Sequence, residues 1–272
     1  MTARIARWVV LCVFLAVVLL PLLWLFVSSL EPNTEFFSRP SNPFSIHWGL
    51  SNYRAVLVEQ PMLRYLFNSL VVSLSSAAIG SLVALLASYV FLFRFPLRGL
   101  IYPLLSFGLF VPTSAFMIPY FLLMSRVGMY NTLSGIALVY VGVSLPTAFL
   151  IVSTHMREAI FSELLEAGFL DGASVHQVFR RIVAPLAAPG AVTAGVFLVI
   201  IGWNELLYAL LLSQDDTSRT VQVAISFLVA TYTANFTEAF AAMIIAVLPV
   251  VIAYVFLGRR IVAGLGTVVG MK

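Results

Sequence analysis

The side chains best suited to contact a polar solute lie close together in one otherwise apolar stretch. Trp203, Asn204 and Glu205 are followed by Tyr208, and Asn68, in an earlier apolar run, is a further candidate. An indole ring offers a flat face to a sugar ring, while amides and carboxylates hydrogen-bond hydroxyl groups. A carboxylate at mid-depth in a membrane costs about 2.5–3.5 kcal/mol and is usually buried in protein or faces a wet cavity. Glu205 therefore has two interpretations: it lines a solute path, or it reaches the outer membrane interface.

The sequence contains no motif for nucleotide binding, metal binding or disulfide formation. The chain has no G-x-x-x-x-G-K-[ST] motif, and its only lysine is Lys272, so it cannot cradle ATP phosphates as a P-loop does. The histidines His47, His155 and His176 show no metal-ligand spacing, and the single cysteine, Cys12, excludes an internal disulfide. We expect no catalytic residue, no metal and no cofactor on this chain, and any energy source must be another subunit.

The composition is that of an integral membrane protein. Of 272 residues, 61% are hydrophobic and 10% are charged, whereas soluble domains average about 25% charged. The expected fold is all-α, a single transmembrane domain over 1–272 with six spans, each near the roughly 20 residues that cross a bilayer. The predicted spans are 8–30, 66–93, 100–124, 133–155, 190–212 and 239–258. The first could be a signal peptide, but its apolar run is longer than the usual 7–15 residues and no cleavage site follows, so we interpret it as an uncleaved span.

The basic residues give the orientation. With both termini in the cytoplasm, the inner segments contain ten of the fifteen basic residues, in agreement with the positive-inside rule. The inner set is Arg4, Arg7, Arg94, Arg98, Arg157, Arg180, Arg181, Arg259, Arg260 and Lys272, and the outer set is Arg39, Arg54, Arg64, Arg126 and Arg219. The loop 158–189 is thereby placed in the cytoplasm.

That loop is the one polar, helix-patterned interruption. A helix with an apolar stripe at i, i+3, i+4 and i+8 begins with Phe161, and a second helix follows Ser174, which is a suitable N-cap. Between them, Asp171 and Gly172 should end the first helix. Pro185 closes the segment. The pattern predicts a hinged pair of short helices.

The loop resembles the E-A-A, G, I-x-L-P signature of the membrane-spanning subunits of binding-protein-dependent ABC importers. The matching or neighbouring positions are Glu166, Ala167, Gly168, Asp171, Gly172, Phe179, Ile182 and Pro185. Gly168 stands where the family usually has Ala, and Ala184 where it usually has Leu. The resemblance implies a coupling helix that docks on a cytoplasmic ATPase, which would bind ATP and Mg. It also implies a second, similar permease subunit and an extracytoplasmic solute-binding protein as partners, and a location in a prokaryotic inner membrane.

Three further stretches carry the same resemblance. The string W-N-E-x-L-Y-A-L at 203–210 looks like the carbohydrate branch, of the maltose and trehalose permease kind. The outer segment 126–134 is similar to the family's LGL-N-T segment through Asn131 and Thr132. The C-terminal segment 259–272 approximately resembles the R-x-x-V-x-G-L ending of that branch.

Other classes of protein fit the sequence less well. A membrane-surface amphipathic helix would normally carry Lys and Arg, whereas the first loop helix carries Glu163, Glu166 and Asp171, which an anionic leaflet would repel. An ion-coupled secondary transporter would place several ionisable residues near mid-membrane, and only Glu205 qualifies. An intramembrane enzyme would need paired carboxylates at one depth. The leading hypothesis is a pore-forming importer subunit for a sugar or similar polyhydroxylated solute, whose identity the sequence does not name.

Overall fold

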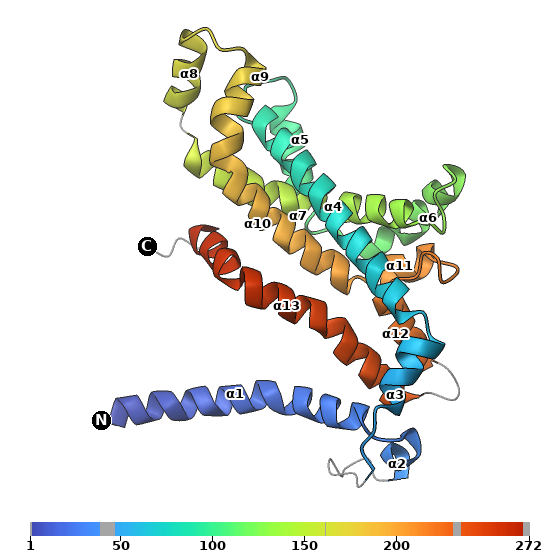
Figure 1. The fold of residues 1–272 in the computed structure, drawn as a ribbon. Coiled ribbons are helices and arrows are strands. Elements are labelled where there is room, and N and C mark those ends of the chain that lie inside the picture. Colours follow the sequence, from blue (N-terminus) through green and yellow to red (C-terminus); the bar gives the residue numbers. More distant parts are fainter. Residues whose placement is uncertain (1, 39–46, 161, 231–234, 269–272) are drawn as a thin grey trace. The chain divides into compact units, whose positions relative to one another are not determined.

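The computed structural model describes residues 2–38, 47–160, 162–230 and 235–268, and throughout these ranges the regular structure is helical, with no strand (Figure 1). The predicted all-α fold is confirmed. Arg39, Gly270 and Lys272, which entered the orientation and the C-terminal resemblance, lie outside these residues.

The chain divides into two compact units. The first contains Met1–Leu66 and Val223–Ala253, and the second contains Phe67–Gln222 and Tyr254–Lys272. The boundaries fall inside helices α4 (Met62–Val90), α12 (Val221–Ala230) and α13 (Phe236–Val268).

The first unit holds an ordered segment between its long helices. After α1 (Thr2–Ser29) come α2 (Asn33–Ser38), α3 (Ser51–Arg54) and a π-helical turn, Ala55–Glu59. Asn52 on α3 is buried and its amide donates to the carbonyls of Ser29 and Glu31, both at 2.8 Å. An aromatic cluster adds to the packing, with ring centroids 5.4–6.5 Å apart; its members are Trp24, Phe36, Phe37, Phe236 and Phe240.

The second unit is built around α7 (Leu133–Ala159) and α10 (Ala184–Asn204), which pack extensively against each other. The buried core joins α4, α7, the loop helices and α10; it includes Ala84, Val152, Met156, Val178, Val183 and Leu198. Small residues permit the close approach. A Cβ added to Gly190 of α10 would lie 2.7 Å from Cβ of His155 on α7, so only glycine fits this crossing without a shift.

The predicted third span is interrupted. α5 (Arg98–Phe107) and α6 (Met117–Arg126) have 10 residues each and are separated by Pro112 and a 3₁₀ turn, Thr113–Phe116. Ten helical residues extend about 15 Å, half of a hydrocarbon core. Proline cannot donate a backbone hydrogen bond and clashes with the preceding turn, which explains the break.

Five helices in the described residues are long and apolar enough to cross a membrane: Arg4–Ser29, Met62–Val90, Leu133–Ala159, Val175–Asn204 and Phe236–Val255. They match the first, second, fourth, fifth and sixth predicted spans. The six-span topology and the single permease domain stay predictions. The apolar stretch from Val221 forms α12, whose 10 residues are too few to cross a bilayer.

Candidate functional site

The predicted helix pair is present between α7 and α10. The first helix is α8 (Ser162–Leu170), and Gly172 follows it with φ +79°. The N–H of Gly172 donates to the Phe169 carbonyl at 3.0 Å, and that of Ala173 to the Gly168 carbonyl at 3.1 Å. This pair of bonds is a Schellman motif, and its left-handed residue is favourable for glycine. The predicted helix stop at Asp171 and Gly172 is confirmed.

The second helix, α9 (Val175–Val178), begins with a capping box. The Gln177 N–H donates to Oγ of Ser174 at 3.3 Å, while the Ser174 N–H donates to Oε1 of Gln177 at 2.8 Å. The predicted N-cap is confirmed. Two backbone donors that would otherwise lack partners are satisfied within the loop, so its turn is locally specified.

The loop has one face packed and one face open. Leu165, Gly168 and Val178 are buried. The open face of α8 mixes acidic and apolar character: Glu163, Glu166 and Ala167 are exposed, and Leu170 is 87% exposed. Asp171 and Gly172 are exposed as well, Phe179 and Ile182 are half-buried, and Pro185 is exposed. An exposed leucine beside carboxylates can bury apolar surface and make charged contacts on one partner.

Gly168 has a packing role. A Cβ at this position would lie 3.0 Å from Cδ1 of Ile182 and 3.5 Å from Cγ2 of Val178. The absence of a side chain therefore lets α8 lie close to the helix that follows it.

The loop is also anchored to α4, by a residue that the sequence did not single out. The Tyr89 hydroxyl donates to the Val175 carbonyl at 2.8 Å, and the Tyr89 ring lies 5.0 Å from that of Phe179 and 5.1 Å from that of Phe93. Phe93 in turn lies 6.2 Å from Phe169 of α8. Tyr89 is 86 positions from Val175, and no local pattern signals such a contact.

A π-helical turn, Phe179–Val183, joins α9 to α10. The Ala184 N–H donates to the Phe179 carbonyl, one residue further back than in an α-helix. Pro185 follows, and a proline ring clashes with the carbonyl four residues earlier in a regular α-helix. A wider turn relieves that clash, and π turns occur often at functional positions. From Val175 to Asn204 the helix is still continuous enough to span 30 residues.

The polar residues predicted for a solute path lie in different environments. Trp203 and Tyr208 are buried, at 6% and 2% exposure, and Asn68 is buried at 2%. The Asn68 amide donates to the carbonyls of Thr217 and Arg219 at 3.1 and 2.8 Å. Asn204 is exposed but donates to the Ile200 carbonyl of its own helix at 2.8 Å. The structure thus does not bring all five side chains to one surface.

Glu205 marks a break in the fifth span. α10 ends at Asn204 and α11 (Leu207–Leu212) begins just beyond it. The half-buried Glu205 carboxylate accepts the N–H groups of Tyr208, at 3.0 and 3.1 Å, and of Ala209, at 3.2 Å. A carboxylate at the N-terminus of α11 accepts hydrogen bonds from the free backbone N–H groups and interacts favourably with the positive end of the helix dipole. Neither predicted interpretation of Glu205 included this capping role.

Two tyrosine hydroxyls join the break to neighbouring elements. Tyr140 of α7 donates to the Glu205 carbonyl at 3.3 Å, and Tyr208 donates to the carbonyl of Thr113, in the interruption between α5 and α6. The two helix interruptions of the second unit are therefore linked directly. Within the described residues, no group of three or more His, Cys, Asp or Glu side chains is placed to hold a metal ion.

Comparison with known proteins decides the family. The model of the binding-protein-dependent transport system inner membrane component matches residues 60–266. The chain belongs to this family. The resemblance inferred from the loop signature is confirmed, and the match covers the loop, α10 and the Glu205 break. The protein is therefore a permease of the ABC transporter class, an inner membrane component.

Curated relatives extend over nearly the whole chain. The chain is 32% identical over 268 residues to a trehalose transport system permease protein of Mycobacterium tuberculosis, covering 96% of each. It is 31% identical over 268 residues to a sulfoquinovosyl glycerol transport system permease protein of Agrobacterium fabrum, covering 98% of this chain and 93% of the relative. A bacterial ABC transporter involved in import of the polysaccharide alginate has the same fold, with a TM-score of 0.75 at 20% identity and coverage of 94% and 95%.

Proposed function

We propose that this permease is a pore-forming subunit of an ATP-driven importer of a sugar or similar polyhydroxylated solute. The observation that supports the coupling is the loop 158–189, which holds α8 firmly on one face and leaves Glu163, Glu166 and Leu170 open on the other. The sugar class is supported by the names of the trehalose and sulfoquinovosyl glycerol relatives.

The proposed assembly has four kinds of component. A cytoplasmic ATPase dimer would bind ATP and Mg and receive α8 in a surface cleft. A second, similar permease would complete the pore, and an extracytoplasmic solute-binding protein would deliver the solute; one matched structure is an alginate transporter in complex with a solute-bound periplasmic protein. Both termini would be cytoplasmic, in a prokaryotic inner membrane.

The loop geometry supports a mechanical role. α8 follows α7 directly, α9 continues through the π turn into α10, and Tyr89 ties α9 to α4. A displacement of α8 by an ATPase would therefore reach three long helices at once. ATP-driven closure of the partner would move these helices and alter access to the pore.

The coupling residues are proposed from their placement. Glu166, Ala167, Asp171 and Gly172 lie at the open surface and would touch the ATPase. Gly168, Phe179, Ile182 and Pro185 shape the fold of the loop behind it. For the solute path, Asn204 is the predicted residue with an exposed side chain, and Glu205 lies beside it half-buried.

Affinity purification from the native membrane tests the coupling. We expect a P-loop ATPase to accompany the wild-type chain and to be lost in Glu166→Lys, which reverses a charge on the open face of α8. Glu158→Lys is the matched control, because Glu158 is also exposed but belongs to the end of α7. It should retain the ATPase.

The same experiment distinguishes the alternatives. Absence of an ATPase from the wild-type sample would reject the importer assembly and return an ion-coupled transporter to consideration. Loss of the ATPase in both variants would show a general charge effect and not docking of α8.

A further inference from the structure

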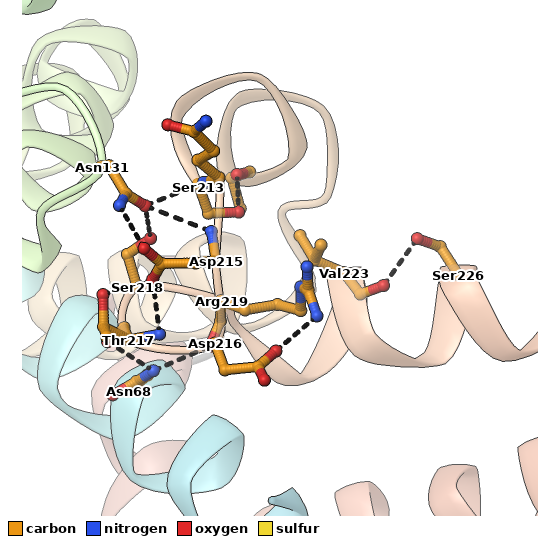
Figure 2. Close-up of polar contacts among 12 residues, drawn as sticks. Asn68, Asn131, Ser213, Asp215, Asp216, Thr217, Ser218, Arg219, Val223 and Ser226 are labelled. Atoms are coloured by element: carbon orange, nitrogen blue, oxygen red, sulfur yellow. Dashed lines mark hydrogen bonds and ion pairs between the residues drawn. The ribbon is translucent and has the colours of Figure 1, made fainter. Parts of the chain in front are cut away.

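A polar junction at the opposite end of α10 from the loop joins three parts of the second unit. The turn 213–220 connects α11 to α12, and it contacts both the turn between α6 and α7 and the start of α4 (Figure 2). The coupling assignment uses none of these contacts. A role for the junction in transport rests on the proposed function, which places this end on the outside.

Asn131 organises the junction. Its φ is 57°, a left-handed conformation that Asn tolerates better than most residues. Its Oδ1 accepts the N–H of Gln214 at 2.8 Å and the Ser218 hydroxyl at 2.5 Å, and its Nδ2 donates to Oδ2 of Asp215 at 2.8 Å. Its backbone N–H donates to the Leu212 carbonyl at 2.9 Å. One side chain thus uses both its donor and its acceptor on the 213–220 turn, as Figure 2 shows.

The other side of the turn is fixed to α4. The buried Asn68 amide holds the Thr217 and Arg219 carbonyls, and the Val221 N–H donates to Oγ of Ser69 at 2.9 Å. Asp215 also closes the turn on itself by accepting the Thr217 N–H at 2.8 Å. The turn is consequently held from two directions.

Asn131 is directly continuous with α7. Thr132 is the N-cap of α7 and accepts the Gly135 N–H at 3.1 Å. A Cβ on Gly135 would lie 2.1 Å from the Met129 carbonyl, so the turn that carries Asn131 is packed tightly on the first turn of the helix. α7 then runs without interruption to Ala159, just before α8.

We propose that Asn131 is a positioning residue that transmits a load on the 213–220 turn to α7, and so to the coupling loop at its far end. A solute-binding protein that presses on the outer surface would then signal to the ATPase through α7. This role gives a structural reason for an asparagine in the N-T segment, to which the sequence alone assigns no purpose.

The Asn131 and Asp215 pair permits an exchange test. Asn131→Asp keeps the size and the tolerance for a left-handed backbone, but it faces one carboxylate with another. Asp215→Asn alone leaves an amide oxygen to accept from Asn131. The double variant, Asn131→Asp with Asp215→Asn, restores one donor and one acceptor in exchanged positions, while the new carboxylate at position 131 can still accept from Gln214 and Ser218.

Two measurements follow, both on the complete complex in liposomes. In a Cys12→Ser background, a spin label at Gln214→Cys, whose side chain is exposed, reports the mobility of the turn. The second readout is ATP hydrolysis with and without the solute-binding protein that accompanies the native complex. We expect Asn131→Asp to mobilise the label and reduce the stimulated rate about tenfold, in line with loss of a hydrogen bond to a charged group, while the basal rate stays. The double variant should recover both.

The outcomes separate the inference from the proposed function. A mobile label with undiminished stimulation, or failure of the double variant to recover, overturns the transmission role. An unchanged label in Asn131→Asp overturns the junction itself. Absence of any ATPase from the wild-type complex overturns the proposed function instead, whereas the mobility of the label still reports whether the junction forms.

Discussion

Removing one oxygen atom, by Tyr89→Phe, tests the anchor between α4 and the coupling loop. The ring contacts with Phe93 and Phe179 stay, and only the bond to the Val175 carbonyl is lost. That carbonyl also accepts the Phe179 N–H, so it is not left without a partner. The cost should therefore be that of an ordinary net hydrogen bond, about 0.5–1.5 kcal/mol.

This free energy corresponds to about a two- to thirteen-fold rise in local opening, at about 1.36 kcal/mol per factor of ten. Amide hydrogen exchange of α8 and α9, in the complex held in lipid nanodiscs, measures that opening. Tyr130→Phe is the matched control, since the Tyr130 ring packs on Phe121 with centroids 5.4 Å apart and its hydroxyl makes no hydrogen bond within the described residues. Exchange that is the same in Tyr89→Phe and in wild type would show that the hydroxyl does not hold the loop, and the argument that α8 moves α4 would fail.

Two further substitutions test the fifth span. Glu205→Ala should lower the free energy of unfolding by about 0.5–2 kcal/mol through loss of the α11 cap, seen as a lower melting temperature. Glu205→Gln should lower it less, because one acceptor oxygen remains. An unchanged melting temperature with weakened solute affinity would assign Glu205 to the solute path instead. Gly190→Ala should cost about 1–3 kcal/mol, because the new Cβ meets His155 at 2.7 Å. Gly99→Ala, with nothing within 4 Å of its Cβ, is the control, and equal melting temperatures for the two variants would refute the close crossing of α7 and α10.

Local features of the loop could be predicted from sequence because their causes are local. Gly172 and Ser174 act through φ and through hydrogen bonds three to five residues away, and the structure has both as expected. The all-helical fold and most of the spans followed from apolar runs of sufficient length.

The solute-path candidates show why the rest could not be predicted. The sequence shows that Trp203 and Tyr208 lie close together along the chain, but it does not show which side of each helix packs against its neighbours. In the structure both side chains are buried. The depth of Glu205 in the apolar run does not reveal its capping role, because that role depends on the break after Asn204. Asn131 and Tyr89 act over 84 and 86 positions, and a single sequence carries no signal for such pairs.

The π turn at Phe179–Val183 has a consequence for how the loop is aimed. A π turn accommodates one residue more than an α-helix does over the same stretch, and each α-helical residue rotates the chain by about 100°. Deleting one residue here, to restore regular winding, would swing α9 and the attached α8 about a quarter of a circle around the axis of α10. Glu166 would then face a different direction with every residue of α8 unchanged. The single extra residue therefore sets the direction in which the exposed face of α8 points, and so the orientation of the surface that an ATPase would meet.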